Sequence, residues 1–244
     1  MFGKILAVEF RMRMREALTP VFAVALPLAL LFGFGLMPDA TKPSDDLGGQ
    51  TTTEYMAVLG TGIAFAILSL IMLPGVLSDY RERGVLRRMR ATPVRPSALL
   101  TAQLVINAGA GAVTAAVMIV AGAAAFGTPV PRAFGWFLLA AVLCLLALLA
   151  LGSLVSAVVP TGRAGNAVGS LLFFPSMFLA GVYIPYDQMP RTLQRICDFT
   201  PLGAGIRSMR DAWMGHAPHP LQLAIMAAYA VVATLAAARL FRWE

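Results

Sequence analysis

Charged residues are scarce in this sequence, and their scarcity excludes an ordinary soluble protein. Asp, Glu, Lys and Arg make up 13% of the 244 residues, against 59% for hydrophobic residues, and the mean hydropathy is +0.77. A typical soluble domain carries about 25% charged residues. We therefore expect an all-α membrane protein. A helical span takes about 20 residues, so six spans leave no room for a second soluble domain, and we expect one transmembrane domain over residues 1–244.

Motifs for enzymatic chemistry are also missing. The sequence has no G-x-x-x-x-G-K-[ST] motif, which excludes ATP hydrolysis by a phosphate-binding loop, and no H-E-x-x-H or G-x-S-x-G. Its two histidines, His216 and His219, flank Pro218. We expect them to lie at the end of a loop and not to bind a metal ion together. Cys144 lies within an apolar run and Cys197 in a loop, so no internal disulfide is expected. We predict no catalytic residue, no metal site and no enzyme.

Ionisable side chains are absent from the central parts of the first five apolar runs. Such residues are costly in a bilayer and usually mark ion or proton pathways. The polar residues that do lie there are uncharged, Gln103 and Asn107 among them. If the chain transports a substrate, we expect the energy to enter from outside the membrane domain.

Six apolar runs are long enough to cross a bilayer. They cover residues 18–37, 55–77, 98–126, 133–159, 167–186 and 220–240. The first run exceeds the roughly 7–15 residues of a signal-peptide core, so we expect it to be retained as a span. Residues 1–17 interleave basic and apolar side chains. This pattern predicts either an amphipathic helix in the membrane interface or an ordinary basic segment that precedes the first span.

The basic residues flank the apolar runs, which indicates membrane topology and not nucleic-acid binding. With the N-terminus in the cytoplasm, 13 of the 19 Lys and Arg residues fall on the inner side and 6 on the outer side. Positive charge concentrates on the cytoplasmic side of membrane proteins. We therefore expect a multi-pass membrane protein with both termini in the cytoplasm.

Residues 78–97 form the densest charge cluster, with six arginines among 20 residues. A helix over residues 82–91 would place Val85, Leu86 and Met89 on one face and the arginines on the other. Two interpretations remain open. The helix docks into a groove of a soluble partner, or the arginines only orient the spans and bind anionic lipid.

Residues 187–219 mix apolar and charged side chains, and Pro190 and Pro201 divide them. We predict two short amphipathic helices, over residues 188–198 and 203–214.

Four charged residues of the same segment stand at i,i+4 spacing: Asp187 with Arg191, and Arg207 with Asp211. This spacing favours two ion pairs on helix surfaces. Such pairs would lower the cost of charge near hydrocarbon.

Two motifs resemble those of ABC-2 type transporter permeases. Residues 82–96, ERGVLRRMRATPVRP, resemble the stretch that follows the second span in that family; Met89 stands where the family often has Leu. Residues 173–185, FFPSMFLAGVYIP, resemble its fifth span, and residues 189–202 follow in the family's order. Together with six spans, the similarity covers essentially the whole chain.

The resemblance implies a transport subunit of the bacterial cytoplasmic membrane without its own ATPase. Permeases of this family pair with a cassette ATPase, usually two of each. We therefore expect two ATPase copies, a second permease copy in a homodimer, and contact with membrane lipid. No cofactor is expected on this chain, because ATP and Mg²⁺ bind to the partner subunit. Residues 1–17 resemble the family's elbow helix, residues 78–97 its coupling segment, and residues 187–219 its outer re-entrant helices.

The expected site residues lie in the coupling segment, in and just before the fifth-span motif and, for Asn107, in the third apolar run. The expected ATPase-contacting residues are Tyr80, Arg81, Glu82, Arg83, Gly84, Leu86, Arg87, Arg88 and Met89. The expected dimer or substrate-path residues are Gly165, Gly169, Phe173, Phe174, Met177 and Asn107. Gly165-x-x-x-Gly169 permits close approach of helices, either between two subunits or within one. The aromatic residues flank the path, or they face lipid or the core.

The expected cargo is apolar or amphipathic, such as a drug, an antibiotic or a lipid. Polysaccharide exporters tend to line their paths with aromatic residues, which make up only 9% of this chain. Export of a polysaccharide or glycolipid is the alternative within the same family. A membrane scaffold that binds lipid through its arginine-rich segment is the alternative outside it.

Overall fold

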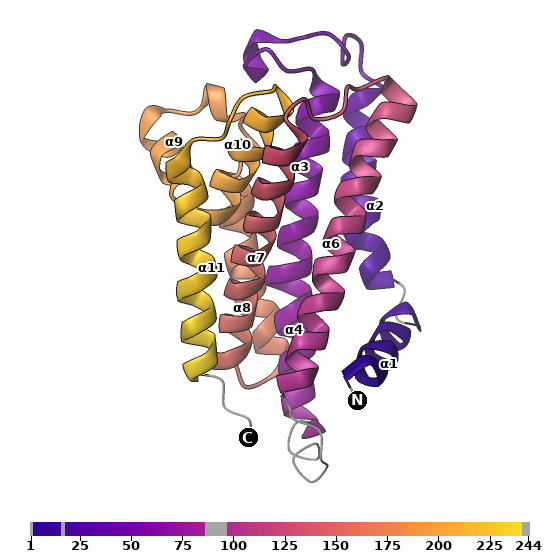
Figure 1. Cartoon of the computed structure of the whole chain (residues 1–244), viewed down its shortest axis with the longest axis vertical. Coiled ribbons are helices and arrows are strands. Elements are labelled where there is room, and N and C mark those ends of the chain that lie inside the picture. The colour runs from indigo at the N-terminus through magenta and orange to yellow at the C-terminus, as the bar shows by residue number, and fades with distance from the viewer. Residues whose placement is uncertain (1, 16–17, 86–96, 241–244) are drawn as a thin grey trace.

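The structure, a computed structural model, describes residues 2–15, 18–85 and 97–240. These residues form helices joined by short connections (Figure 1). The elements in chain order are α1 (Phe2–Arg15), α2 (Leu18–Gly35), η1 (Asp45–Leu47), α3 (Thr52–Ala66), η2 (Ile67–Met72), α4 (Leu73–Glu82), α6 (Ser97–Phe126), α7 (Phe134–Val158), α8 (Gly162–Leu179), η3 (Tyr186–Gln188), α9 (Arg191–Asp198), α10 (Pro201–Trp213) and α11 (Pro220–Leu240). The all-α prediction is confirmed for the described residues.

Four of the described helices are long and apolar enough to cross a membrane. They are Thr52–Glu82 (α3, η2 and α4 together), Ala98–Phe126, Phe134–Val158 and Pro220–Leu240. α2 is a shorter apolar helix, Val21–Gly35 over its hydrophobic part. α8 begins with a polar turn that contains Arg163 and Asn166. The arrangement in six spans therefore stays a prediction.

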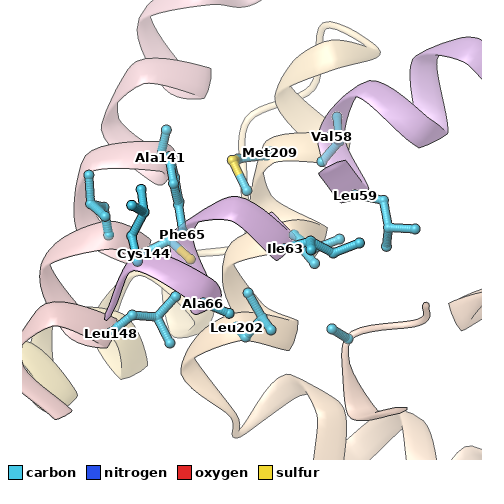
Figure 2. Packing of buried hydrophobic residues seen from close by; sticks show 14 of the residues in the cluster. Val58, Leu59, Ile63, Phe65, Ala66, Ala141, Cys144, Leu148, Leu202 and Met209 are labelled. Carbon is cyan, nitrogen blue, oxygen red and sulfur yellow. The ribbon is translucent and has the colours of Figure 1, made fainter. Parts of the chain in front are cut away.

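The continuous helix Thr52–Glu82 forms the centre of the bundle, and other helices bury 89% of its most apolar stretch. α2, α6, α7, α8 and α10 pack around it. Figure 2 shows Phe65 and Ala66 of this helix close to Cys144 of α7 and Leu202 of α10. Lipid or protein can cover a helix that is apolar on all sides, and Phe134–Val158 is more apolar but less buried. The central position therefore depends on packing between helices and not on composition alone.

A π-turn, η2, interrupts the central helix just before Pro74. The Leu73 N–H bonds to the carbonyl of Leu68, five residues back. The Ser69 carbonyl therefore lacks an α-type partner, and it also lacks a π-type partner because Pro74 has no N–H. Proline and π-turns are both common causes of a helix kink, and here Pro74 follows the π-turn by two residues.

Glycines from two neighbouring helices make room for this irregular backbone. A methyl group at Gly152 of α7 would overlap the Ser69 carbonyl oxygen, and one at Gly169 of α8 would overlap the Leu70 carbonyl oxygen. Close Cα–H···O contacts of this kind recur where helices meet. Glycine at these two positions therefore allows α7 and α8 to reach the backbone of the central helix.

The two ends of the bundle carry different features. α1, the last turn of α11, the end of α4 and the α7–α8 turn lie at one end, called here the lower end as drawn in Figure 1. α9 and α10 lie towards the upper end. The described parts of residues 1–17 and 78–97 are thus at the same end of the molecule.

Candidate functional site

The end of α4 holds both sides of the turn between α7 and α8. Arg81 Nη1 donates hydrogen bonds to the carbonyls of Val159 (2.9 Å) and Ala157 (3.5 Å), at the C-terminal end of α7. The Glu82 carboxylate accepts a bond from the backbone N–H of Gly162 (2.9 Å), the first residue of α8. A positive charge at a helix C-terminus and a negative charge at a helix N-terminus both match the helix dipole. We call Arg81 and Glu82 the α4 clasp.

Tyr80 joins the same end of α4 to the N-terminal helix. Its hydroxyl donates to Glu9 Oε2 of α1 (2.8 Å), and this oxygen also accepts from Gln103 Nε2 of α6 (2.6 Å). Arg13 of α1 donates to Gln103 Oε1 (3.0 Å). Hydrogen bonds thus connect the end of α4 to α1, α6, α7 and α8.

The chain leaves α4 after Glu82 and turns at Gly84. Gly84 has a φ of +66°, a conformation that glycine adopts without steric cost. Arg83 bonds to Asp79 one turn back, at 2.9 Å. The predicted helix over residues 82–91 is therefore wrong at its start, because Glu82 is the last residue of α4 and the turn follows it. Leu86, Arg87, Arg88 and Met89 lie outside the described residues. Contact of residues 80–89 with an ATPase stays a prediction.

A second polar cluster lies at the upper end, around Arg210 of α10, which is only 6% exposed. Arg210 Nε donates to Gln50 Oε1 (2.6 Å), and its Nη2 donates to the Leu47 carbonyl (2.8 Å) and to Asp187 Oδ2 (2.9 Å). The guanidinium also lies over the ring of Tyr55, 4.9 Å from its centroid. This Arg210 cluster joins η1, α3, η3 and α10.

The predicted i,i+4 ion pairs of this region are not the pairs that form, because Asp187 and Arg207 each meet a partner from another element. Asp187 of η3 pairs with Arg210, and Asp198 of α9 pairs with Arg207 of α10, both at 2.9 Å. η3 and α9 fold back onto α10, and this long-range packing overrides the local spacing. Nothing in the local sequence around Arg210 indicates these partners.

At the upper end, Cys197 is buried in the fold and His219 bonds to the start of α11. Cys197 is a free thiol, 2% exposed, and burial raises its pKa to about 12. His219 Nδ1 accepts from the backbone N–H of Leu221 (3.3 Å) in the first turn of α11. Among the described residues, no group of three or more His, Cys, Asp and Glu side chains could hold a metal ion.

Comparison with known proteins assigns the chain to a family. The sequence model of the ABC-2 type transporter matches residues 2–214. The chain belongs to the ABC-2 type transporter family. It is 28% identical over 204 residues to Nodulation protein J of Azorhizobium caulinodans. This alignment covers 82% of this chain and 78% of that protein. It is 32% identical over 99 residues to Nodulation protein J of Rhizobium leguminosarum bv. viciae, which covers 40% and 38%.

This membership makes the chain a multi-pass membrane component of a transporter. ABC-2 permeases normally work with an ATPase subunit. The match includes α1, the α4 clasp and the Arg210 cluster, and it ends just after α10.

The two glycines expected at a dimer face of this ABC-2 transporter lie inside the chain. Gly169 packs on the Leu70 carbonyl, and a methyl group at Gly165 would lie 2.9 Å from the Pro74 carbonyl oxygen. Of the two interpretations of the glycine pair, the structure shows packing within one chain. The close approach of α8 to α4 and η2 requires both glycines.

The structure does not bring the remaining path residues to one place. Phe173 and Met177 of α8 are buried, whereas the neighbouring Phe174 is 61% exposed, with its ring centroid 5.5 Å from that of Phe173. Asn107 lies in α6 and lines a cavity formed with α1 and α2. A common substrate path for these residues stays a proposal.

Proposed function

We propose that this ABC-2 type transporter is the permease of an ATP-driven exporter for an amphipathic cargo, such as a drug, an antibiotic or a lipid. Two copies form a homodimer in the bacterial cytoplasmic membrane and bind two cassette ATPase subunits, which hold ATP and Mg²⁺. The observation that carries the proposal is the α4 clasp, because it connects the arginine-rich segment to two further helices.

The distribution of positive charge supports an orientation with the lower end in the cytoplasm. Residues 1–17 and 78–97 hold ten of the 19 basic residues, and their described parts lie at the lower end. Positive charge favours the cytoplasmic side. Both termini and the ATPase-binding segment then face the compartment that contains ATP.

The geometry of the α4 clasp suggests how a movement of the ATPase reaches the membrane. When the two ATPases close on ATP, they displace residues 78–97. Arg81 and Glu82 transmit this displacement to the end of α7 and the start of α8, and Tyr80 transmits it to α1. Each contact lies at a helix terminus or on a helix face, so whole helices tilt and the path between the two copies opens.

The exposed face of α8 supports a role in that path. Leu171, Phe174 and Phe178 are 71%, 61% and 40% exposed. A contiguous apolar face of this kind marks a contact with lipid or with another subunit. We assign it to the second copy and to the apolar part of the cargo, with Phe173 and Met177 packed behind it.

The test is reconstitution with the ATPase. The permease is purified from native membranes, reconstituted with the cassette ATPase that accompanies it, and assayed for ATP-dependent uptake of a fluorescent amphipathic dye into inside-out vesicles. We expect uptake to require both subunits. Glu82→Arg reverses the charge at the α8 N-terminus, and Gly84→Pro cannot adopt the observed φ. Both variants are expected to lose at least about 90% of uptake.

Asp46→Arg is the matched control, because it makes the same charge change at an exposed residue of η1, at the opposite end of the bundle from the α4 clasp. It is expected to retain uptake. Recovery of the permease without any cassette ATPase, or uptake that is independent of ATP, would overturn the proposal and favour a lipid-binding scaffold.

A further inference from the structure

Helix α9 exposes two arginines that have no acidic partner in the part of the chain that the structure describes. Arg191 and Arg195 are both exposed and stand one helical turn apart. The two acids of this segment, Asp187 and Asp198, pair with arginines of α10 instead. Like charges at this spacing repel each other. The two exposed arginines therefore favour an anion from outside the described chain.

Apolar side chains continue the exposed face of α9. Ile196 is 49% exposed and Phe199 is 58% exposed. At about 100° per residue, the exposed face runs from Arg191 through Arg195 and Phe199 to Ile196, while Cys197 lies on the buried side. One edge of this face is basic and the other is apolar. Such a helix lies in a membrane interface, with its apolar side chains at the acyl boundary and its charges among the headgroups.

Contacts on α10 place α9 at the level of the membrane surface. Arg207 of α10 bonds to Asp198, the last residue of α9, at 2.9 Å. The next residue, Ser208, bonds to Gln222 in the first turn of α11, at 3.1 Å. α11 is long and apolar enough to cross a membrane, so its first turn lies where the apolar layer begins. The end of α9 therefore lies at the same level, beside the upper end of α11 (Figure 1).

An anionic phospholipid matches both edges of the exposed face. Its phosphate accepts hydrogen bonds from guanidinium groups, whose planar donors can bind two oxygens at once. Its acyl chains cover Ile196 and Phe199, whose exposure to water is unfavourable. A zwitterionic headgroup carries its own cation, which competes with the arginines for the phosphate. A soluble phosphate ion would neutralise the arginines but would leave the apolar edge uncovered.

We propose that α9 binds the phosphate of an anionic phospholipid, such as phosphatidylglycerol, through Arg191 and Arg195, in the leaflet at the upper end of the bundle. Ile196 and Phe199 enter the acyl boundary of the same leaflet. α9 has eight residues, too few for a stable isolated helix, and the bound lipid helps to hold it against α10. This site requires neither ATP nor an ATPase, so it can be tested separately from the proposed export.

Photo-crosslinking of the full chain in nanodiscs tests this proposal. The nanodiscs contain equal parts of phosphatidylcholine and phosphatidylglycerol with the same acyl chains, and no ATPase. Phe199 is replaced by p-benzoylphenylalanine, which bonds to a neighbouring C–H group under ultraviolet light. The mass of the adduct identifies the lipid. We expect at least about five-fold more adduct with phosphatidylglycerol than with phosphatidylcholine, because even one basic residue near the surface favours anionic lipid by about this factor.

Two pairs of substitutions separate the arginines of α9 from positive charge in general. Arg191→Gln with Arg195→Gln keeps polar side chains but removes both charges, so the two lipids should form adducts equally. Arg11→Gln with Arg15→Gln is the matched control, because it removes two exposed arginines at the same spacing from α1, at the opposite end of the bundle. The lipid preference at position 199 should persist in this control.

A second position for the crosslinker tests whether the preference is local. Val142 is 45% exposed in α7, a helix without charged residues. p-Benzoylphenylalanine at position 142 should form adducts with both lipids equally. A preference for phosphatidylglycerol of the same size at positions 142 and 199 would reflect the composition of the whole lipid shell and would overturn the proposal.

Four further results would overturn it. Equal adducts of the two lipids at position 199 in the protein with both arginines would show that α9 does not select an anionic lipid. A preference that survives the loss of both arginines would assign the selection to other residues. A crosslink to a second copy of the chain in place of lipid would make this face a protein interface. A preference that is abolished by inorganic phosphate, but not by sodium chloride of the same ionic strength, would assign the arginines to a soluble anion.

Discussion

The carboxylate of Glu82 lies 2.9 Å from the backbone nitrogen of Gly162, 80 positions later in the chain. The bond satisfies one of the free N–H groups of the first turn of α8. Thr161 satisfies another, because its hydroxyl accepts from the N–H of Ala164 at 3.3 Å. The start of α8 therefore has one cap from its own sequence and one from α4.

Removal of the distant cap should loosen the start of α8 locally. We expect Glu82→Ala to reduce stability by about 1 kcal/mol, as for other lost caps, and to speed amide hydrogen exchange in residues 162–165. The measurement is hydrogen exchange by mass spectrometry on detergent-solubilised protein. Asp46→Ala, which removes a carboxylate from an exposed loop, should leave exchange in α8 unchanged. If both variants exchange like the wild type in residues 162–165, Glu82 does not cap α8.

The glycines beside the π-turn should tolerate no side chain. In Gly152→Ala and Gly169→Ala the new methyl group would overlap a backbone carbonyl oxygen of the central helix, and backbone can move less than a side chain can. We expect each variant to lose about 3 kcal/mol, at the upper end of overpacking costs, seen as a lower unfolding temperature in detergent.

Gly135→Ala is the control for these variants. Gly135 also lies in α7, but its Cβ would meet nothing within 4 Å. Alanine is the better helix former, by up to about 1 kcal/mol, so this variant should be as stable as the wild type or more stable. Equal effects at Gly135 and Gly152 would mean that the contact with the π-turn has no energetic role.

The sequence was sufficient to predict helices that are long apolar runs with polar limits and helices that begin at a proline. The expected run 220–240 coincides with α11, and the run 98–126 agrees with α6 to one residue. Both are long apolar stretches with polar limits. The short helices α9 and α10 were expected within a few residues, because Pro190 and Pro201 start them.

Contacts between distant segments were not predictable in the same way. The expected span over residues 167–186 is wrong at both limits, since α8 covers Gly162–Leu179. Its early start depends on the caps from Thr161 and Glu82, and only the first of these is local. The Arg210 cluster brings together residues 160 positions apart, and no local spacing encodes such a pairing.

Loss of the Arg210 side chain should destabilise the upper end. Arg210→Met leaves Asp187 and Gln50 without their cationic partner in a largely buried site. Removing one partner of a buried ion pair typically costs about 3–5 kcal/mol, and we expect the lower end of this range because Asp187 is partly exposed. The measurement is thermal unfolding in detergent.

Arg191→Met makes the same substitution at an exposed arginine of α9 and is expected to change stability by less than about 0.5 kcal/mol. Arg210→Lys, which keeps the charge but not the geometry of three separate bonds, should fall between them. An Arg210→Met variant as stable as Arg191→Met would show that the cluster contributes nothing.

The thiol of Cys197 should be unreactive in the folded protein. It is 2% exposed, and burial raises its pKa to about 12, whereas an ordinary thiol with a pKa of about 8.5 is half ionised at pH 8.5. Maleimides react with the thiolate. We therefore expect labelling of the wild-type protein at pH 8.5 to be at least about ten-fold slower than labelling at position 46 in Asp46→Cys, which lies in an exposed loop.

Denaturation in SDS should make both native cysteines reactive, since Cys144 is also buried. Fast labelling at Cys197 before denaturation would mean that α9 is not packed on α10, and the ion pair between Asp198 and Arg207 would then be lost as well.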